Sequence, residues 1–160
     1  MIEKSICCHY KVLELENELD DPYVSLLNRA KNNTANSYAP YSKFNVGACI
    51  LLENGEMIDG SNHENAAFPM CLCAEQVAVA NFHNLKSKEK IICMAISADS
   101  KDKIINTPVP PCGACRQILF ELTEILNQDF KIILQGFSGP IYIIESVRSL
   151  LPVSFDSSIL

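Results

Sequence analysis

Short apolar runs separated by turn residues recur along this chain, and each run is long enough to form a strand. The continuous apolar run over residues 91–98 is typical of a central strand that is buried on both faces. Glu53-Asn54-Gly55 lies between two such runs and is typical of a tight β-hairpin turn. The pattern predicts five strands, over residues 46–52, 57–61, 91–98, 130–134 and 141–144.

Other segments have apolar residues at the spacing of an α-helix. Val24, Leu27 and Ala30 share one helical face, and Pro22 suits the first turn of that helix. Alternation of helices and strands is typical of an α/β domain, so we expect a three-layer α/β/α fold with a mixed, about five-stranded sheet. The predicted helices span residues 21–38, 73–82 and 113–126, with a short helix over 145–151.

The first 20 residues are harder to place. Residues 9–15 alternate only partly between apolar and polar types, which would fit one additional strand. Cys7-Cys8-His9 contains metal-binding residue types, but adjacent cysteines do not easily share one tetrahedral ion. We therefore expect residues 1–20 to be an N-terminal extension of uncertain structure, and residues 21–160 to form a single domain.

Composition and charge narrow the function classes. The net charge of −6 over 160 residues argues against a basic groove, so no nucleic-acid partner is expected. No stretch approaches the apolar length of a membrane span, and the opening residues do not resemble a targeting signal. We expect a cytoplasmic protein without membrane association. Its eight cysteines would then be metal-binding, catalytic or buried thiols rather than a disulfide framework.

Two cysteine-containing segments each precede a predicted helix, namely Cys73-Ala74-Glu75 and Pro110-Pro111-Cys112-Gly113-Ala114-Cys115. Free N–H groups at a helix N-terminus stabilise negative charge and so favour the thiolate form of cysteine. Cys112 and Cys115 are three residues apart and can point to the same side of one turn. Cys73 could arrive from a neighbouring helix N-terminus. The sequence therefore predicts one Zn²⁺ per chain, bound by Cys73, Cys112 and Cys115.

Three thiolates leave one of the four tetrahedral zinc positions open, which is typical of a catalytic site. Zinc lowers the pKa of bound water toward neutrality, and Glu75 could transfer a proton from that water to a substrate nitrogen. Two alternatives remain open at this point. One is a closed structural zinc site with Cys71, Cys93 or a histidine as fourth ligand, and the other is a core without metal.

These segments resemble the small cytidine deaminases whose zinc ligands are all cysteines, within the zinc deaminase superfamily. The resemblance runs from about residue 39 to residue 155 and is densest over residues 39–48, 60–67 and 111–117. It implies hydrolytic deamination of cytidine and 2'-deoxycytidine to uridine and 2'-deoxyuridine, with release of ammonia, in pyrimidine salvage. It also implies that Glu75 is the catalytic residue.

The resemblance implies substrate contacts as well. Asn62 and Glu64 match the pair that hydrogen-bonds the ribose hydroxyls, and an amide with a carboxylate can both donate to and accept from a hydroxyl. Phe44 matches an aromatic residue that packs against the pyrimidine. Backbone groups of Ala74 and Pro110 match contacts to the base carbonyl and to the departing amino group, although the family usually has Ser or Thr in place of Pro110.

One further match concerns assembly. Phe155 matches a C-terminal aromatic residue that reaches a neighbouring subunit's site in the homotetrameric members. We therefore expect a homotetramer, with a dimer as the alternative.

One position departs from the family pattern in a way that bears on the chemistry. The family usually reads Cys-Ala-Glu-Arg, whereas Gln76 stands here in place of the arginine and brings no charge to offset the thiolates. The helix N-termini or Arg116 could compensate, or the enzyme could be slower or have another substrate. Blasticidin-type deaminases also lack this arginine, so a related cytosine-nucleoside antibiotic is the alternative substrate. A non-catalytic zinc-binding or RNA-binding module is a further alternative, against which Glu75 and the acidic charge argue.

Overall fold

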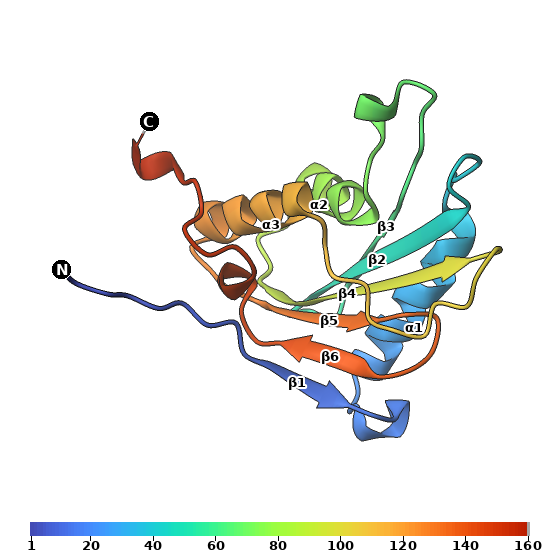
Figure 1. The fold of residues 1–160 in the computed structure, drawn as a ribbon, viewed down its shortest axis with the longest axis horizontal. Helices are drawn as coiled ribbons and strands as arrows, with labels where there is room; N and C mark the ends of the chain where they lie inside the picture. The colour runs from blue at the N-terminus through green and yellow to red at the C-terminus, as the bar shows by residue number, and fades with distance from the viewer. Residues whose placement is uncertain (160) are drawn as a thin grey trace.

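In a computed structural model, which describes residues 1–159, six strands form one mixed sheet in the order β1-β6-β5-β4-β2-β3 (Figure 1). Neighbouring strands are antiparallel except β4 and β5, which are parallel. A parallel pair needs a crossover, and α3 supplies it between these two strands. The strands are β1 (Tyr10–Leu13), β2 (Phe44–Leu52), β3 (Met57–Ser61), β4 (Ile91–Ser100), β5 (Lys131–Gln135) and β6 (Ile141–Ile144).

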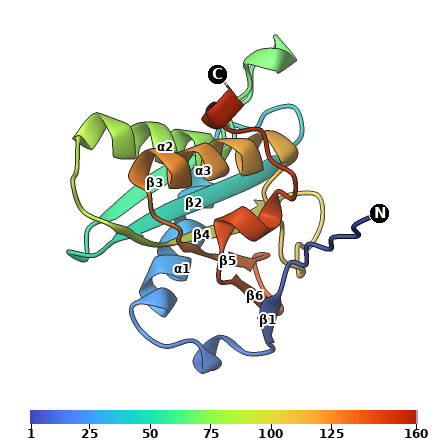
Figure 2. The same ribbon diagram turned by 90° about the vertical axis from the view of Figure 1, so that its left-hand side faces the viewer.

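Helices cover both faces of the sheet, as the sequence predicts. Helix α1 lies on one face, and α2 and α3 lie side by side on the other (Figures 1 and 2). The α-helices are α1 (Tyr23–Asn33), α2 (Ala74–Leu85) and α3 (Gly113–Leu126). The three-layer architecture is therefore confirmed. None of the described helices is long and apolar enough to cross a membrane.

Alternating side chains of β2 contribute to two separate apolar cores. Ala48, Ile50 and Leu52 pack into the core beneath α2 and α3, whereas Cys49 and Leu51 pack into the core beneath α1. This period of two, with apolar residues on both faces, marks a strand buried between two helical layers.

Two glycines let helices approach the sheet closely. A Cβ atom at Gly47 would lie 2.0 Å from the carbonyl oxygen of Ala30 in α1, and one at Gly60 would lie 2.2 Å from that of Ala74 in α2. Side chains at either position would push a helix away. The contact at Gly60 bears directly on function because it sets the position of the N-terminal turn of α2.

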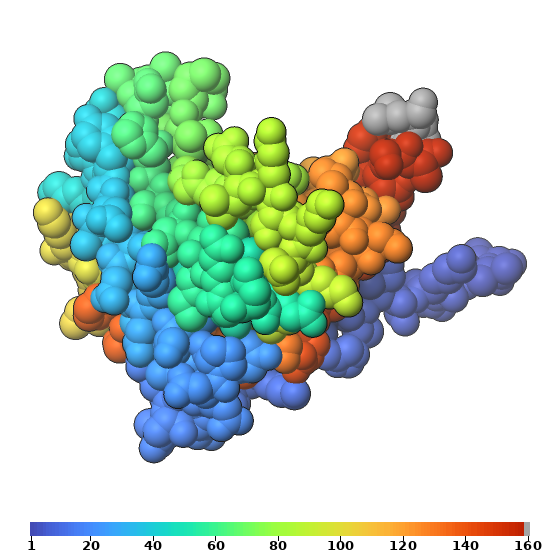
Figure 3. Space-filling model, turned by 180° about the vertical axis from the view of Figure 1, so that it is seen from behind, coloured from blue at the N-terminus to red at the C-terminus, as the bar shows by residue number. Residues whose placement is uncertain are grey.

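The sheet has six strands rather than the predicted five, a minor correction. The additional strand is β1, which pairs antiparallel with β6 at the sheet edge. Three of its four residues are exposed, so its apolar pattern is too weak to identify a strand securely. The residues before β1 extend away from the body of the molecule (Figure 3). The helix predicted over residues 21–38 ends earlier, with α1 giving way after Asn33 to a 3-10 turn, Thr34–Asn36.

Candidate active site

Three cysteine side chains meet where the N-termini of α2 and α3 converge. Cys73 and Cys112 are the N-cap residues of α2 and α3, and Cys115 lies in the first turn of α3. The Sγ atom of Cys112 lies 3.9 Å from that of Cys73 and 3.4 Å from that of Cys115. All three sulfur atoms lie within 4.8 Å of one another, a group that could hold a metal ion.

The spacing and donor type of this group fit zinc. A tetrahedral zinc ion with Zn–S distances of about 2.3 Å holds its sulfur ligands about 3.8 Å apart, close to the separations here. The two alternative cysteine ligands are not part of this group. Cys71 forms hydrogen bonds with the backbone of Asn65, and Cys93 is buried in the core beneath α1. Among the described residues, the metal-binding group consists of Cys73, Cys112 and Cys115, and no histidine or fourth cysteine belongs to it.

The three thiols hydrogen-bond to one another. Hydrogen bonding to the Cys115 thiol, ahead of that to Cys112, lowers the pKa of Cys73 to about 7, against burial and the nearby Glu75 carboxylate. The same bond to Cys73 raises the pKa of Cys115. The backbone N–H of Cys115 also donates to the Cys112 sulfur at 3.4 Å. Cys73 is therefore more easily deprotonated than an ordinary cysteine, and a metal-binding thiol must lose its proton.

Glu75 is the acidic residue next to this cluster. It lies in the first turn of α2, and only 5% of its surface is exposed. Burial raises the pKa of its carboxyl group. A buried carboxyl group whose pKa is raised can hold and release a proton at higher pH than an exposed one, which suits proton transfer.

Gln76 stands where the family usually has an arginine, and Arg116 is a nearby residue that could supply the missing positive charge. The side-chain oxygen of Gln76 accepts a hydrogen bond from the backbone N–H of Cys73 at 2.9 Å, and so satisfies an otherwise free donor at the N-terminus of α2. The Arg116 guanidinium donates to the backbone carbonyl oxygens of Pro111, at 2.9 Å, and Leu150, at 3.1 Å. Both side chains thus bind backbone groups around the cluster rather than the sulfurs.

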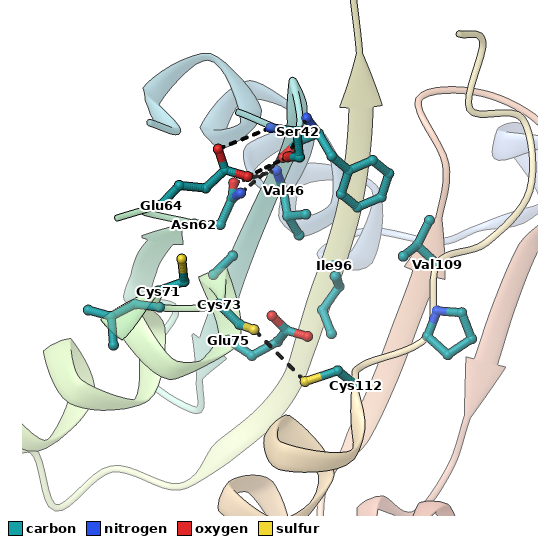
Figure 4. Close-up of a pocket in the computed structure, with 14 residues that line it drawn as sticks. Ser42, Val46, Asn62, Glu64, Cys71, Cys73, Glu75, Ile96, Val109 and Cys112 are labelled. Atoms are coloured by element: carbon teal, nitrogen blue, oxygen red, sulfur yellow. Dashed lines mark hydrogen bonds between the residues drawn. The ribbon is translucent and has the colours of Figure 1, made fainter. Parts of the chain in front are cut away.

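A cavity of about 260 Å³ opens beside the cysteines. Cys73, Cys112 and Glu75 lie at one end of it, and Asn62, Glu64 and Ser42 lie at the other (Figure 4). Most of the predicted site residues line this cavity, namely Phe44, Asn62, Glu64, Cys73, Ala74, Glu75, Pro110 and Cys112.

The polar end of the cavity is held by hydrogen bonds to the start of β2. The Asn62 side chain donates to the carbonyl oxygen of Phe44 at 2.9 Å and accepts from the N–H of Val46 at 2.7 Å. The Glu64 carboxylate accepts hydrogen bonds from the backbone N–H groups of Tyr41 and Ser42, at 2.9 and 3.3 Å, and from the Ser42 hydroxyl. Both side chains are fixed before any ligand arrives.

Two of the predicted residues form part of the cavity wall, and a third lies outside the cavity. Phe44 and Pro110 line the wall of the cavity, and the Lys103 ammonium lies 5.9 Å from the centre of the Phe44 ring. Phe155 is not brought to this cavity. It is 56% exposed and lines a separate cavity beside α2 and α3, where its carbonyl oxygen accepts a hydrogen bond from Gln117. Any contact of Phe155 with a cavity of this kind would have to involve another copy of the chain.

Five further residues line the cavity that the sequence does not single out, namely Ser42, Val46, Leu72, Ile96 and Val109. Val46 and Ile96 belong to apolar strands, where nothing local separates a cavity wall from a core residue. Ser42 lies in the turn before β2, between Pro40 and Phe44. Its position next to the predicted site residue Phe44 is the one sequence feature that could have indicated a place in the cavity.

The chain is similar to known proteins over most of its length. A sequence model for the cytidine and deoxycytidylate deaminase zinc-binding region matches residues 22–127. A cytidine deaminase of Halalkalibacterium halodurans is 38% identical over 132 residues, covering 82% of this chain and 92% of that protein.

Solved structures agree with these sequence matches. The crystal structure of a cytidine deaminase from Burkholderia pseudomallei matches with a TM-score of 0.70 and 31% identity, covering 82% of this chain and 97% of that one. A cytidine deaminase from Mycobacterium tuberculosis matches with a TM-score of 0.64 and 28% identity, over 86% and 99% of the two chains.

Proposed function

This chain belongs to the family of zinc-binding cytidine and deoxycytidylate deaminases, and from this premise we propose that it hydrolyses cytidine and 2'-deoxycytidine to uridine, 2'-deoxyuridine and ammonia. The observation that carries the proposal is the meeting of three cysteine sulfurs and a buried glutamate at one end of a cavity. Cys73, Cys112 and Cys115 are the zinc ligands. When bound, zinc acts as a Lewis acid that lowers the pKa of water at its open position.

Glu75 moves the protons in this reaction. It takes a proton from the water that attacks C4 of the cytosine ring and delivers it to N3. It then transfers the second proton of that water to the amino group, which leaves as ammonia while the C4 carbonyl forms. The burial that raises its pKa lets one carboxyl group both accept and donate.

The cytosine ring lies between Phe44 and the N-terminus of α2. Phe44 packs against the ring, and its place in the cavity wall supports this role. The backbone N–H of Ala74 donates to the C2 carbonyl of the base. The carbonyl oxygen of Pro110 accepts from the departing amino group, and because this contact uses the backbone it does not depend on the side chain at that position.

Asn62 and Glu64 bind one sugar hydroxyl between them. Three hydrogen bonds from Tyr41 and Ser42 leave the Glu64 carboxylate with one of its four acceptor positions free. The Asn62 amide has one N–H left after its bond to Phe44. A hydroxyl that donates to Glu64 and accepts from Asn62 matches this remaining capacity. A site that hydrogen-bonds only one sugar hydroxyl is compatible with both ribose and 2'-deoxyribose.

We also propose that the enzyme works as a cytoplasmic homotetramer in pyrimidine salvage. Large exposed apolar side chains gather beside the cavity mouth, where the ring centres of Tyr41 and Phe68 lie 5.9 Å apart and Tyr38 stacks on His63. Exposed apolar surface of this kind is typical of a subunit interface. The exposed Phe155 would then complete a neighbouring subunit's cavity.

The direct test is to quantify uridine and ammonia after cytidine is added to zinc-loaded protein, with 2'-deoxycytidine and blasticidin S in parallel. We expect equimolar uridine and ammonia from cytidine, and turnover of 2'-deoxycytidine within about tenfold of it in kcat/KM. Turnover of blasticidin S with neither nucleoside deaminated would contradict the proposal and favour the antibiotic as substrate, with the uncharged Gln76 as the suspected cause.

A further inference from the structure

The Ser42 hydroxyl connects the two ends of the proposed nucleoside site. It donates a hydrogen bond to the Glu64 carboxylate and accepts one from the backbone N–H of Phe44 at 3.1 Å. One oxygen atom is thus bonded both to the proposed sugar-binding carboxylate and to the residue that packs against the base. Figure 4 shows Ser42 beside Glu64, at the end of the cavity away from the cysteines, and Phe44 lines the same cavity.

The backbone conformation next to Ser42 explains why the hydrogen bond from the Phe44 N–H matters. Lys43, between Ser42 and Phe44, has a φ of +54°, a left-handed conformation that is uncommon for residues other than glycine. The chain must turn sharply here to place the Phe44 ring in the cavity wall. The bond across the turn, from the Phe44 N–H to the Ser42 hydroxyl, stabilises that conformation.

The carboxylate depends on the same turn. All three hydrogen bonds that Glu64 accepts come from Tyr41 and Ser42, so the orientation of its free oxygen lone pair follows the position of this segment. The bond from Ser42 is also the largest influence that lowers the pKa of Glu64 and keeps it ionised as an acceptor.

From these contacts we infer that Ser42 is a positioning residue, whose hydroxyl fixes Glu64 and Phe44 relative to each other so that sugar and base are recognised together. This inference rests on the proposed function, because it takes Glu64 as the sugar contact and Phe44 as the base contact. Ser42 itself lies at the end of the cavity away from the cysteines and Glu75, so it is not assigned a catalytic role.

The test compares two product-like ligands that differ only in their sugar hydroxyls, uridine and 2',3'-dideoxyuridine, in binding to zinc-loaded protein by NMR titration. Neither ligand is turned over, so the dissociation constants report binding alone. For Ser42→Ala we expect the uridine dissociation constant to rise about tenfold, the effect of one hydrogen bond to a charged group. The dideoxyuridine constant should rise no more than about threefold, through the Phe44 turn alone.

Two variants serve as controls. Ser42→Thr keeps the hydroxyl and should bind both ligands as the unaltered protein does. Ser37→Ala removes a hydroxyl from the same connection, where it donates to Asn45 outside the cavity lining, and should leave both constants unchanged. Equal losses for the two ligands in Ser42→Ala, or no loss for either, would overturn the inference. Failure of the unaltered protein to deaminate cytidine would instead count against the proposed function, while the titrations would still measure the effect of Ser42.

Discussion

The sulfur atoms of Cys73 and Cys112 lie 3.9 Å apart, although 39 residues separate them in the chain. Both residues are N-caps, so the N-termini of α2 and α3 point at the same place. The partial positive charge at each N-terminus favours the thiolates that zinc requires. Side-by-side packing of two helices on one face of the sheet therefore creates the metal site.

Removal of one cysteine from the cluster should abolish metal binding. We expect Cys115→Ser to retain less than about a tenth of one zinc ion per chain after gel filtration, because two thiolates bind zinc far more weakly than three. Elemental analysis of the purified protein measures this. The matched control is Cys71→Ser, which alters a nearby cavity thiol outside the cluster and should retain about one zinc per chain. Full zinc occupancy in Cys115→Ser would show that the ion binds elsewhere.

Loss of the Glu64 carboxylate should weaken substrate binding more than it slows the chemistry. We expect Glu64→Gln to raise the KM for cytidine about tenfold and to change kcat by less than about threefold, because the proposed contact of this group is with the sugar and not with C4. Steady-state kinetics separates the two parameters. Glu53→Gln alters an exposed glutamate in the β2–β3 turn and should leave both unchanged. A fall in kcat alone would contradict the sugar-binding role.

Asp59 should make stability depend on pH. Burial alone would raise the pKa of its carboxyl group, but hydrogen bonds from Arg29 and Asn33 outweigh burial and lower it. The ionised form is therefore favoured in the folded state, and this stabilisation is present above the ordinary carboxyl pKa and lost as the pH falls through the lowered value.

We expect Asp59→Asn to reduce the free energy of unfolding at pH 7 by about 1 kcal/mol, measured by urea denaturation. The difference from the unaltered protein should shrink as the pH falls below about 4. Asp102→Asn breaks a more exposed ion pair, with Lys43, and should change stability little. A difference that stays constant down to acid pH would rule out the ionic origin.

Replacement of Phe155 tests the proposed homotetramer. If it completes the cavity of another copy, sedimentation should show four 17.7 kDa chains per particle, and Phe155→Ala should lower kcat/KM about tenfold without unfolding the chain. Phe137→Ala removes an equally exposed aromatic side chain and should have no such effect. A monomeric and fully active Phe155→Ala enzyme would refute an intersubunit role.

The sequence predicts those helices and strands whose apolar pattern and end signals lie within the element itself. The bounds of α3 and β6 coincide with the predicted ranges because apolar patterns end there at polar residues, and those of β3 do so because a hairpin turn at Glu53-Asn54-Gly55 precedes it. The edge strand β1 was only weakly indicated by the sequence, because a mostly exposed strand does not need an apolar face. The cysteine cluster was predictable because a Pro-Cys-x-x-Cys segment before a helix already brings two cysteines together in one turn.

The rest of the cavity depends on contacts between distant segments. Ile96 becomes a cavity residue only because α2 and α3 pack across β4, and no pattern within β4 marks it. Ser42 acquires its place through a hydrogen bond to a residue 22 positions away. The position of Phe155 relative to a cavity depends on assembly, which lies beyond what one chain determines.

Replacement of Glu75 by glutamine tests the central claim most directly, because it removes the proposed proton carrier and keeps the size of the side chain. Ammonia release from cytidine and zinc content should be measured on the same preparation of Glu75→Gln. We predict that kcat falls by about 10²–10⁴-fold while about one zinc ion per chain is retained. Unchanged turnover with zinc in place would contradict the account, since some other group would then be moving the protons.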